Sequence, residues 1–116
     1  MPTKRPGQRL ADILENITRI ESYVEGLTLA RFESDTMRID AVERCLARIS
    51  EAAVKLGDDA ETLAPEVPWR ELRGLGNILR HEYSVVDTRR LWLTIEKDLA
   101  PLKVACQRAL AVAKGK

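Results

Sequence analysis

Histidine, cysteine and aromatic residues are scarce in this chain of 116 residues. It has one histidine, two cysteines, two tryptophans, two tyrosines and one phenylalanine. One histidine and two cysteines far apart in the sequence cannot form a zinc site of recognisable spacing. Cys45 and Cys106 each fall in an apolar helical pattern, so we expect two buried free thiols. We therefore expect no metal and no cofactor.

Long hydrophobic runs and nucleotide-binding loops are also missing. Nothing approaches the ~20 apolar residues of a membrane span. The N-terminal residues are followed by an amphipathic pattern rather than by the continuous apolar stretch of a signal peptide. We expect a cytoplasmic protein that makes no membrane contact. The stretch "GLGN" at residues 74–77 is no phosphate-binding loop, because no Lys-Ser/Thr follows it and no strand pattern precedes it.

Apolar residues recur at helical spacing in four segments, in a composition with 45% hydrophobic and 32% charged residues. The first helix is expected over residues 9–25 and the second over residues 35–56. Gly26 and Gly57 stand where the C-terminal caps of these helices belong. Ser34 or Asp35 can cap the start of the second helix by accepting a hydrogen bond from its free N–H groups. An acidic connector at residues 57–67 has room for one helical turn.

The second half of the chain predicts two more helices. Pro68 suits the first turn of the third helix, which should fray near His81. Asp87 is a good cap for the fourth helix, which Pro101 is expected to kink. We expect residues 1–8 to be a flexible basic tail and residues 9–116 to form a single all-α domain. The expected fold is an up-and-down bundle of four to five helices.

Charge is unevenly distributed although the net charge is only +1. Residues 51–66 contain five acidic side chains against Lys55, whereas residues 70–90 contain five arginines against three acids. The positive segment also holds His81, whose unperturbed pKa allows proton transfer near neutral pH. Arginine has a planar fork that matches phosphate oxygens, so a histidine among arginines suits the cleavage of RNA phosphodiesters. On the residues alone, solvated helix faces, a structural His81 and a packed Tyr83 remain open as alternatives.

The stretch "PWRELRGLGNILRHEYSVVD" at residues 68–87 resembles the signature of the HepT-like proteins of the HEPN superfamily. The blocks "ADILENITRIESYVEGLT", "DAVERCLARISEAAVKL" and "DLAPLK" extend the resemblance over most of the chain. It implies an all-helical homodimer that acts as the toxin of a toxin–antitoxin module of type VII. It also implies a metal-independent endoribonuclease, with tRNA or mRNA as its RNA substrate. The implied partner is a minimal nucleotidyltransferase antitoxin, which silences the ribonuclease by transferring AMP from ATP to a tyrosine.

The family motif is an arginine, four residues, a histidine, one residue and a tyrosine. By this resemblance the catalytic histidine is His81, the AMP-accepting tyrosine is Tyr83, and the polar residue beside the motif arginine is Asn77. The position of the motif arginine is occupied by Gly76. Further RNA contacts are expected from three arginines of the same segment, which are Arg70, Arg73 and Arg80.

Gly76 leaves three interpretations of this chain. The first is a disarmed toxin, because loss of one preorganised charge-stabilising group costs about 10²–10³ in rate. The second is compensation, in which Arg73 or Arg80, one helical turn away on roughly the same face, reaches the phosphate instead. The third is a non-catalytic HEPN module that dimerises and only binds RNA or the antitoxin.

Overall fold

The structure is a computed structural model that describes residues 5–81 and 87–114, without the side chains of residues 80 and 81. Within these ranges every regular element is a helix. Four of the helices, α1 (Pro6–Val24), α3 (Thr36–Leu56), α5 (Trp69–His81) and α7 (Leu99–Lys114), have 13 to 21 residues. Three shorter helices lie between them: α2 (Leu29–Glu33), α4 (Asp58–Leu63) and α6 (Thr88–Lys97). The all-α bundle predicted from the sequence is confirmed.

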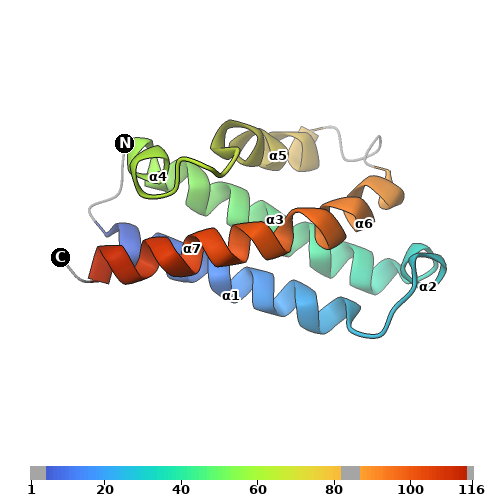
Figure 1. Cartoon of the computed structure of the whole chain (residues 1–116). Helices are drawn as coiled ribbons and strands as arrows, with labels where there is room; N and C mark the ends of the chain where they lie inside the picture. Colours follow the sequence, from blue (N-terminus) through green and yellow to red (C-terminus); the bar gives the residue numbers. More distant parts are fainter. Residues whose placement is uncertain (1–4, 82–86, 115–116) are drawn as a thin grey trace.

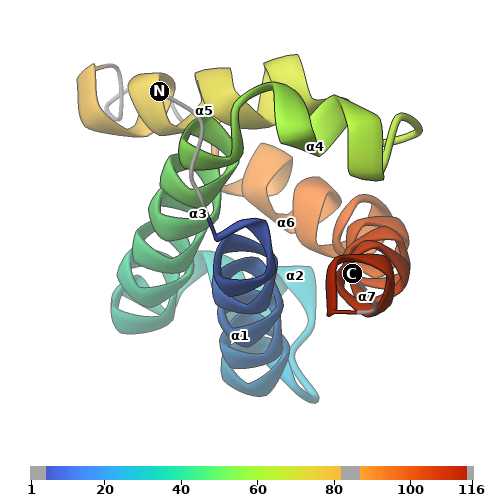
Figure 2. The same ribbon diagram turned by 90° about the vertical axis from the view of Figure 1, so that its left-hand side faces the viewer.

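The long helices lie side by side in an elongated bundle of 45 × 29 × 20 Å (Figure 1). Helix α1 packs against α3 and α7, and α5 packs on α3. The view along the bundle shows α3 between α5 and α1, with α6 and α7 on the opposite side of the bundle from α3 (Figure 2). Helix α3 is therefore the central element that carries α5, where the sequence motif begins. No helix in the described ranges is long and apolar enough to cross a membrane.

The core is formed by the apolar faces that the periodicity of the sequence predicts. Nine side chains from α1, α2 and α3 have no exposed surface: Leu10, Ile13, Ile17, Ile20, Phe32, Val42, Ile49, Ala53 and Leu56. Trp69 at the start of α5 is 1% exposed, and its indole N–H donates a hydrogen bond to the Ala64 carbonyl oxygen at 2.8 Å. This bond satisfies the only polar group of a buried tryptophan and fastens the connector to the beginning of α5.

The helix ends confirm several capping predictions. The Asp35 carboxylate accepts a hydrogen bond from the Arg38 N–H at 3.1 Å, and the Asp87 carboxylate accepts one from the Arg89 N–H at 3.0 Å. Gly26 and Gly57 have φ angles of 75° and 58°. These angles lie in the left-handed region, where a residue without Cβ is under little strain.

Three features of the helices differ from the prediction. Helix α1 begins at Pro6, so residues 6–8 belong to it rather than to the basic tail. The reason is that proline is well suited to the first helical position, where its missing N–H costs nothing. The short helix α2 was not predicted at all. The fourth helix is divided at Asp98 into α6 and α7. The proline ring of Pro101 crowds the carbonyl of the residue four positions earlier, which is Lys97, and the helix is divided directly after that residue.

Candidate functional site

The candidate site is the C-terminal half of α5, from position 76 onward. Gly76 is buried, whereas the next residue, Asn77, is exposed. His81 is the last residue of α5, and its side chain lies outside the described part of the structure, as does that of Arg80. Tyr83 lies outside the described residues altogether. The backbone thus places Gly76, Asn77 and His81 on one helix, with positions 77 and 81 one turn apart on the same side.

Ser50 of α3 holds the backbone of α5 at this point. Its hydroxyl donates a hydrogen bond to the Arg73 carbonyl oxygen at 2.9 Å and accepts one from the Gly76 N–H at 2.9 Å. Ser50 is only 2% exposed, so both bonds form away from bulk water. A buried hydroxyl with both partners is satisfied, and it ties two successive turns of α5 to α3. Sequence reasoning missed Ser50, although a serine inside the apolar stripe of α3 was a signal for such a contact.

Arg73 is engaged with backbone and carboxylate groups at the end of α3. Its guanidinium donates hydrogen bonds to the Gly57 carbonyl oxygen at 2.8 Å and to the Ala53 carbonyl oxygen at 3.2 Å. It also binds both carboxylate oxygens of Glu61, at 2.7 and 2.9 Å. The hydrogen bond from Arg73 lowers the pKa of Glu61 below its usual value, and the same bond raises the pKa of Arg73.

Three other arginines of the positive segment have surroundings different from those of Arg73. Arg70 is exposed on the first turn of α5. Arg89 is 3.8 Å from Glu33, and Arg90 lines a cavity beside α5. The structure therefore separates these guanidinium groups: Arg73 binds inward, while Arg70 is open to solvent. No cluster of histidine, cysteine and acidic residues that could hold a metal ion occurs in the described ranges.

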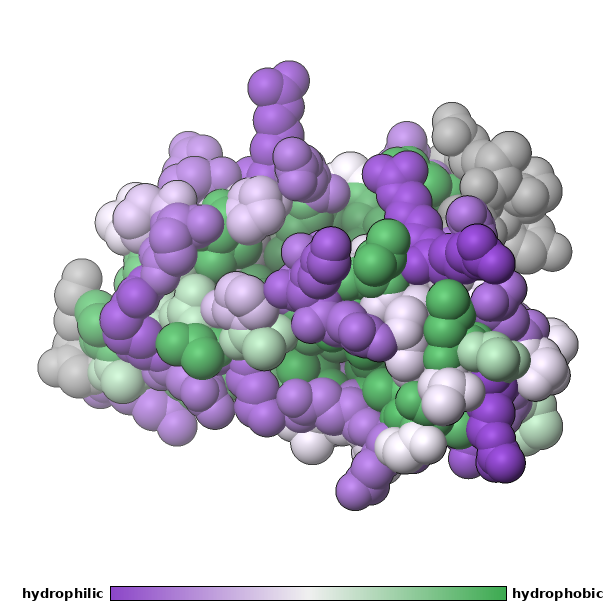
Figure 3. Space-filling view, turned by 45° about the vertical axis from the view of Figure 1, so that its right-hand side comes forward, coloured by the Kyte–Doolittle hydropathy of each residue, from purple (hydrophilic) through white to green (hydrophobic). Residues whose placement is uncertain are grey.

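A cavity of about 610 Å³ opens between α5 and the α6–α7 pair. Its walls are mainly apolar, with Ile49 of α3, Leu72 and Leu75 of α5, and Leu102 of α7 among them. On the neighbouring surface, hydrophobic side chains are interspersed with hydrophilic ones (Figure 3). Val104 on α7 is 63% exposed.

The architecture is that of an all-α protein of the HEPN type. The chain belongs to the ribonuclease HepT-like family, whose model matches residues 13–109. The protein named "Probable ribonuclease HepT" of Thermococcus cleftensis is 38% identical over 94 residues, covering 81% of this chain and 86% of the relative. "Putative RNase MJ1380" of Methanocaldococcus jannaschii is 34% identical over 94 residues, with the same two coverages. No solved structure matches the chain significantly.

Proposed function

We propose that this chain is the toxin of a HepT-type toxin–antitoxin module, with an endoribonuclease site that Gly76 has disarmed. The proposal is supported by membership of the ribonuclease HepT-like family and by the placement of residue 76. The family motif expects a guanidinium five residues before His81, on the helix turn that Ser50 fastens to α3. Glycine at this position lacks the guanidinium that would bind phosphate.

The proposed reaction cleaves RNA at a phosphodiester bond. The ribose 2′-oxygen bonds to phosphorus, the bond from phosphorus to the 5′-oxygen breaks, one proton leaves the 2′-hydroxyl, and one is gained by the 5′-oxygen. His81 is the group whose pKa suits it to move such a proton. The motif arginine would stabilise the negative charge that develops on the phosphoryl oxygens, which is why its loss should reduce the rate by about 10²–10³.

Compensation by Arg73 is less favourable than disarming. To reach a phosphate, the Arg73 guanidinium would have to release two backbone carbonyls and the Glu61 carboxylate. Those carbonyls belong to the last turn of α3 and its cap, where intrahelical donors are lacking. Asn77 and Arg70 are exposed and remain free to contact RNA.

The proposed partners are a second copy of this chain, a minimal nucleotidyltransferase antitoxin and an RNA substrate. Transfer of AMP to Tyr83 would add a negatively charged phosphodiester beside the site, which would repel RNA phosphates. Incubation of the chain with such an antitoxin and ATP should add the mass of one AMP to Tyr83. An unchanged mass, or AMP on another residue, would remove this part of the proposal.

The central test compares RNA cleavage by the unaltered chain with cleavage by Gly76→Arg. We expect little cleavage by the chain itself and an increase of about 10²–10³ in the arginine variant. Gly76→Ala is the matched control, because it adds a side chain without a guanidinium and should stay inactive. The double variant Gly76→Arg with His81→Ala should also be inactive. If Gly76→Arg is folded and dimeric but no more active than Gly76→Ala, the chain is not a disarmed ribonuclease.

A further inference from the structure

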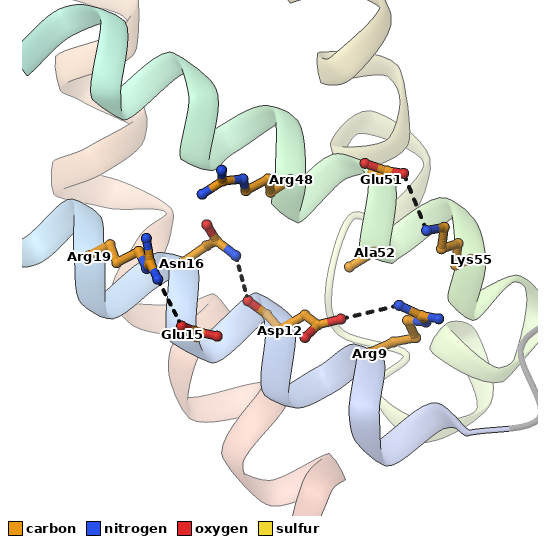
Figure 4. Close-up of a pocket in the computed structure, with 9 residues that line it drawn as sticks. All are labelled: Arg9, Asp12, Glu15, Asn16, Arg19, Arg48, Glu51, Ala52 and Lys55. Atoms are coloured by element: carbon orange, nitrogen blue, oxygen red, sulfur yellow. Dashed lines mark hydrogen bonds and ion pairs between the residues drawn. The ribbon is translucent and has the colours of Figure 1, made fainter.

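A polar groove of about 390 Å³ runs between α1 and α3, away from the apolar cavity beside α5 (Figure 4). Its residues on α3, such as Arg48 and Lys55, lie on the side of that helix turned away from Ser50 and α5. Nine residues line it: Arg9, Asp12, Glu15, Asn16, Arg19, Arg48, Glu51, Ala52 and Lys55. On an ordinary solvated helix face, each of these charged side chains would pair with one of opposite charge. In this groove only some of the charged side chains are paired in this way.

Three of the four cations in the groove are paired with an acid on their own helix. The pairs are Arg9 with Asp12 at 3.3 Å, Arg19 with Glu15 at 3.0 Å, and Lys55 with Glu51 at 3.2 Å. The fourth cation, Arg48, makes no ion pair or hydrogen bond with any group in the described ranges. The groove therefore contains one positive charge in excess, carried by an exposed guanidinium.

Asn16 adds a buried acceptor that has no partner. The residue is 7% exposed, and its amide nitrogen donates a hydrogen bond to the Asp12 carbonyl oxygen at 2.9 Å. A carbonyl can only accept, so this bond fixes which end of the amide is nitrogen. The amide oxygen, Oδ1, is buried and accepts no hydrogen bond from the described residues. It points toward the side of the groove where Arg48 extends from α3 (Figure 4).

We propose that this groove is an RNA subsite in which Arg48 binds a backbone phosphate and Asn16 Oδ1 accepts a hydrogen bond from a ribose 2′-hydroxyl. A ligand that presents an anion and a hydroxyl donor close together would pair with the Arg48 guanidinium and donate a hydrogen bond to Asn16 Oδ1. RNA presents this pair at every nucleotide, whereas DNA lacks the hydroxyl. The subsite rests on the proposed function, because it would hold RNA that also reaches α5.

The groove and the motif helix lie on different sides of α3. Ser50 bonds to the Gly76 backbone, whereas Arg48 in the groove wall precedes Ser50 by two residues and points about 160° away from it around the helix. RNA bound at Arg48 and Asn16 would therefore pass around α3 to reach the end of α5.

Binding of three labelled single strands of one sequence tests the subsite: RNA, DNA and 2′-O-methyl RNA. Fluorescence anisotropy with the full chain should show RNA bound about three- to tenfold more tightly than the other two, the range expected for one hydrogen bond. The 2′-O-methyl strand matters because it keeps the RNA backbone but cannot donate. Asn16→Leu should abolish this preference by weakening RNA binding alone, and thermal unfolding should verify that the variant is folded.

Arg48 is tested through the dependence of affinity on salt. Arg48→Ala should weaken the binding of all three strands and reduce the slope of log K against log salt by about 0.7, the value for one phosphate contact on a single strand. The matched control is Arg31→Ala, which removes one exposed arginine from α2, outside the groove. Its slope should equal that of the unaltered chain.

Three results would overturn the subsite. These are equal binding of the three strands, an RNA preference that survives Asn16→Leu, and an Arg48→Ala slope equal to that of Arg31→Ala. The last two are expected if Arg48 simply closes onto Asn16 in solution. If neither the chain nor Gly76→Arg binds RNA at all, the proposed function falls together with the subsite. If RNA binds and Gly76→Arg cleaves it while the groove variants change nothing, only the subsite falls.

Discussion

Replacing Arg73 by alanine should destabilise the fold, and not only weaken the binding or cleavage of RNA. The Arg73 guanidinium bridges α5 to the end of α3, where it donates to the carbonyl oxygens of Ala53 and Gly57, and to α4 through Glu61. Carbonyls in the last turn of a helix have no intrahelical donor, so they need a partner from elsewhere. Arg73 supplies that partner, and its side chain is 26% exposed.

The size of the effect follows from these contacts. A hydrogen bond from a charged donor contributes about 1.5–3 kcal/mol when buried. Partial exposure places each of the two carbonyl bonds at the low end of that range or below it, and the pair with the half-exposed Glu61 adds little. We therefore expect Arg73→Ala to lower the free energy of unfolding by about 2–3 kcal/mol, which corresponds to a fall in Tm of about 10 °C.

The assay is urea unfolding of Arg73→Ala beside Arg70→Ala. Arg70 lies one turn earlier on α5 and is exposed, so its replacement should change stability by less than about 0.5 kcal/mol. Equal stabilities of the two variants would refute the structural role of Arg73. The same pair also tests compensation: if the unaltered chain cleaves RNA and Arg73→Ala stops cleavage without loss of stability, then Arg73 acts on the phosphate.

Three further outcomes can be measured on the same preparations. Gly74→Ala should raise the free energy of unfolding by about 0.5–1 kcal/mol in urea, because an added Cβ meets no atom within 4 Å in the interior of α5; Gly26→Ala, at a φ of 75°, should lower it by about 1 kcal/mol. Cys45 and Cys106 should react with an alkylating reagent only after unfolding, because both are buried and burial raises the pKa of Cys106 to about 12; rapid native labelling would contradict this. The hydrogen bond from Arg73 lowers the pKa of Glu61 in the folded protein. The stabilising effect of this bond is therefore complete above the ordinary pKa of 4.5 and is lost as the pH falls through the lower pKa of the folded state. The stability difference between the unaltered chain and Glu61→Gln should therefore shrink below pH 4.5, and a constant difference would show that the charge plays no part.

The architecture was predictable because local signals and the global fold agree. Each long helix combines an apolar stripe at helical spacing with a recognisable end, such as Asp35 before α3 and Gly57 after it. Asp87 before α6 is a third case. Where local propensity, pattern and capping favour the same structure, a sequence specifies its helices strongly.

Helix α2 was missed because its stability is not local. Five residues are too few for a helix to be stable by itself or to show a periodic pattern. What holds α2 is its single large apolar residue: Phe32 is fully buried, and its ring lies 5.2 Å from that of Trp92 on α6. This contact joins residues 60 positions apart, and such contacts cannot be read from spacing within one segment.

The arginines of residues 70–90 show the same limit within the candidate site. A run of arginines predicts a positive surface, but it does not say which guanidinium groups are already engaged by the protein. Arg73 is engaged by groups 12 to 20 residues earlier in the chain, and Ser50 reaches the Gly76 backbone from 26 residues away. The contact that holds position 76 to α3 uses the backbone N–H and therefore requires no side chain at that position. This is the physical reason to expect that Gly76→Arg would place a guanidinium on a turn that is already fixed, without first having to build the site.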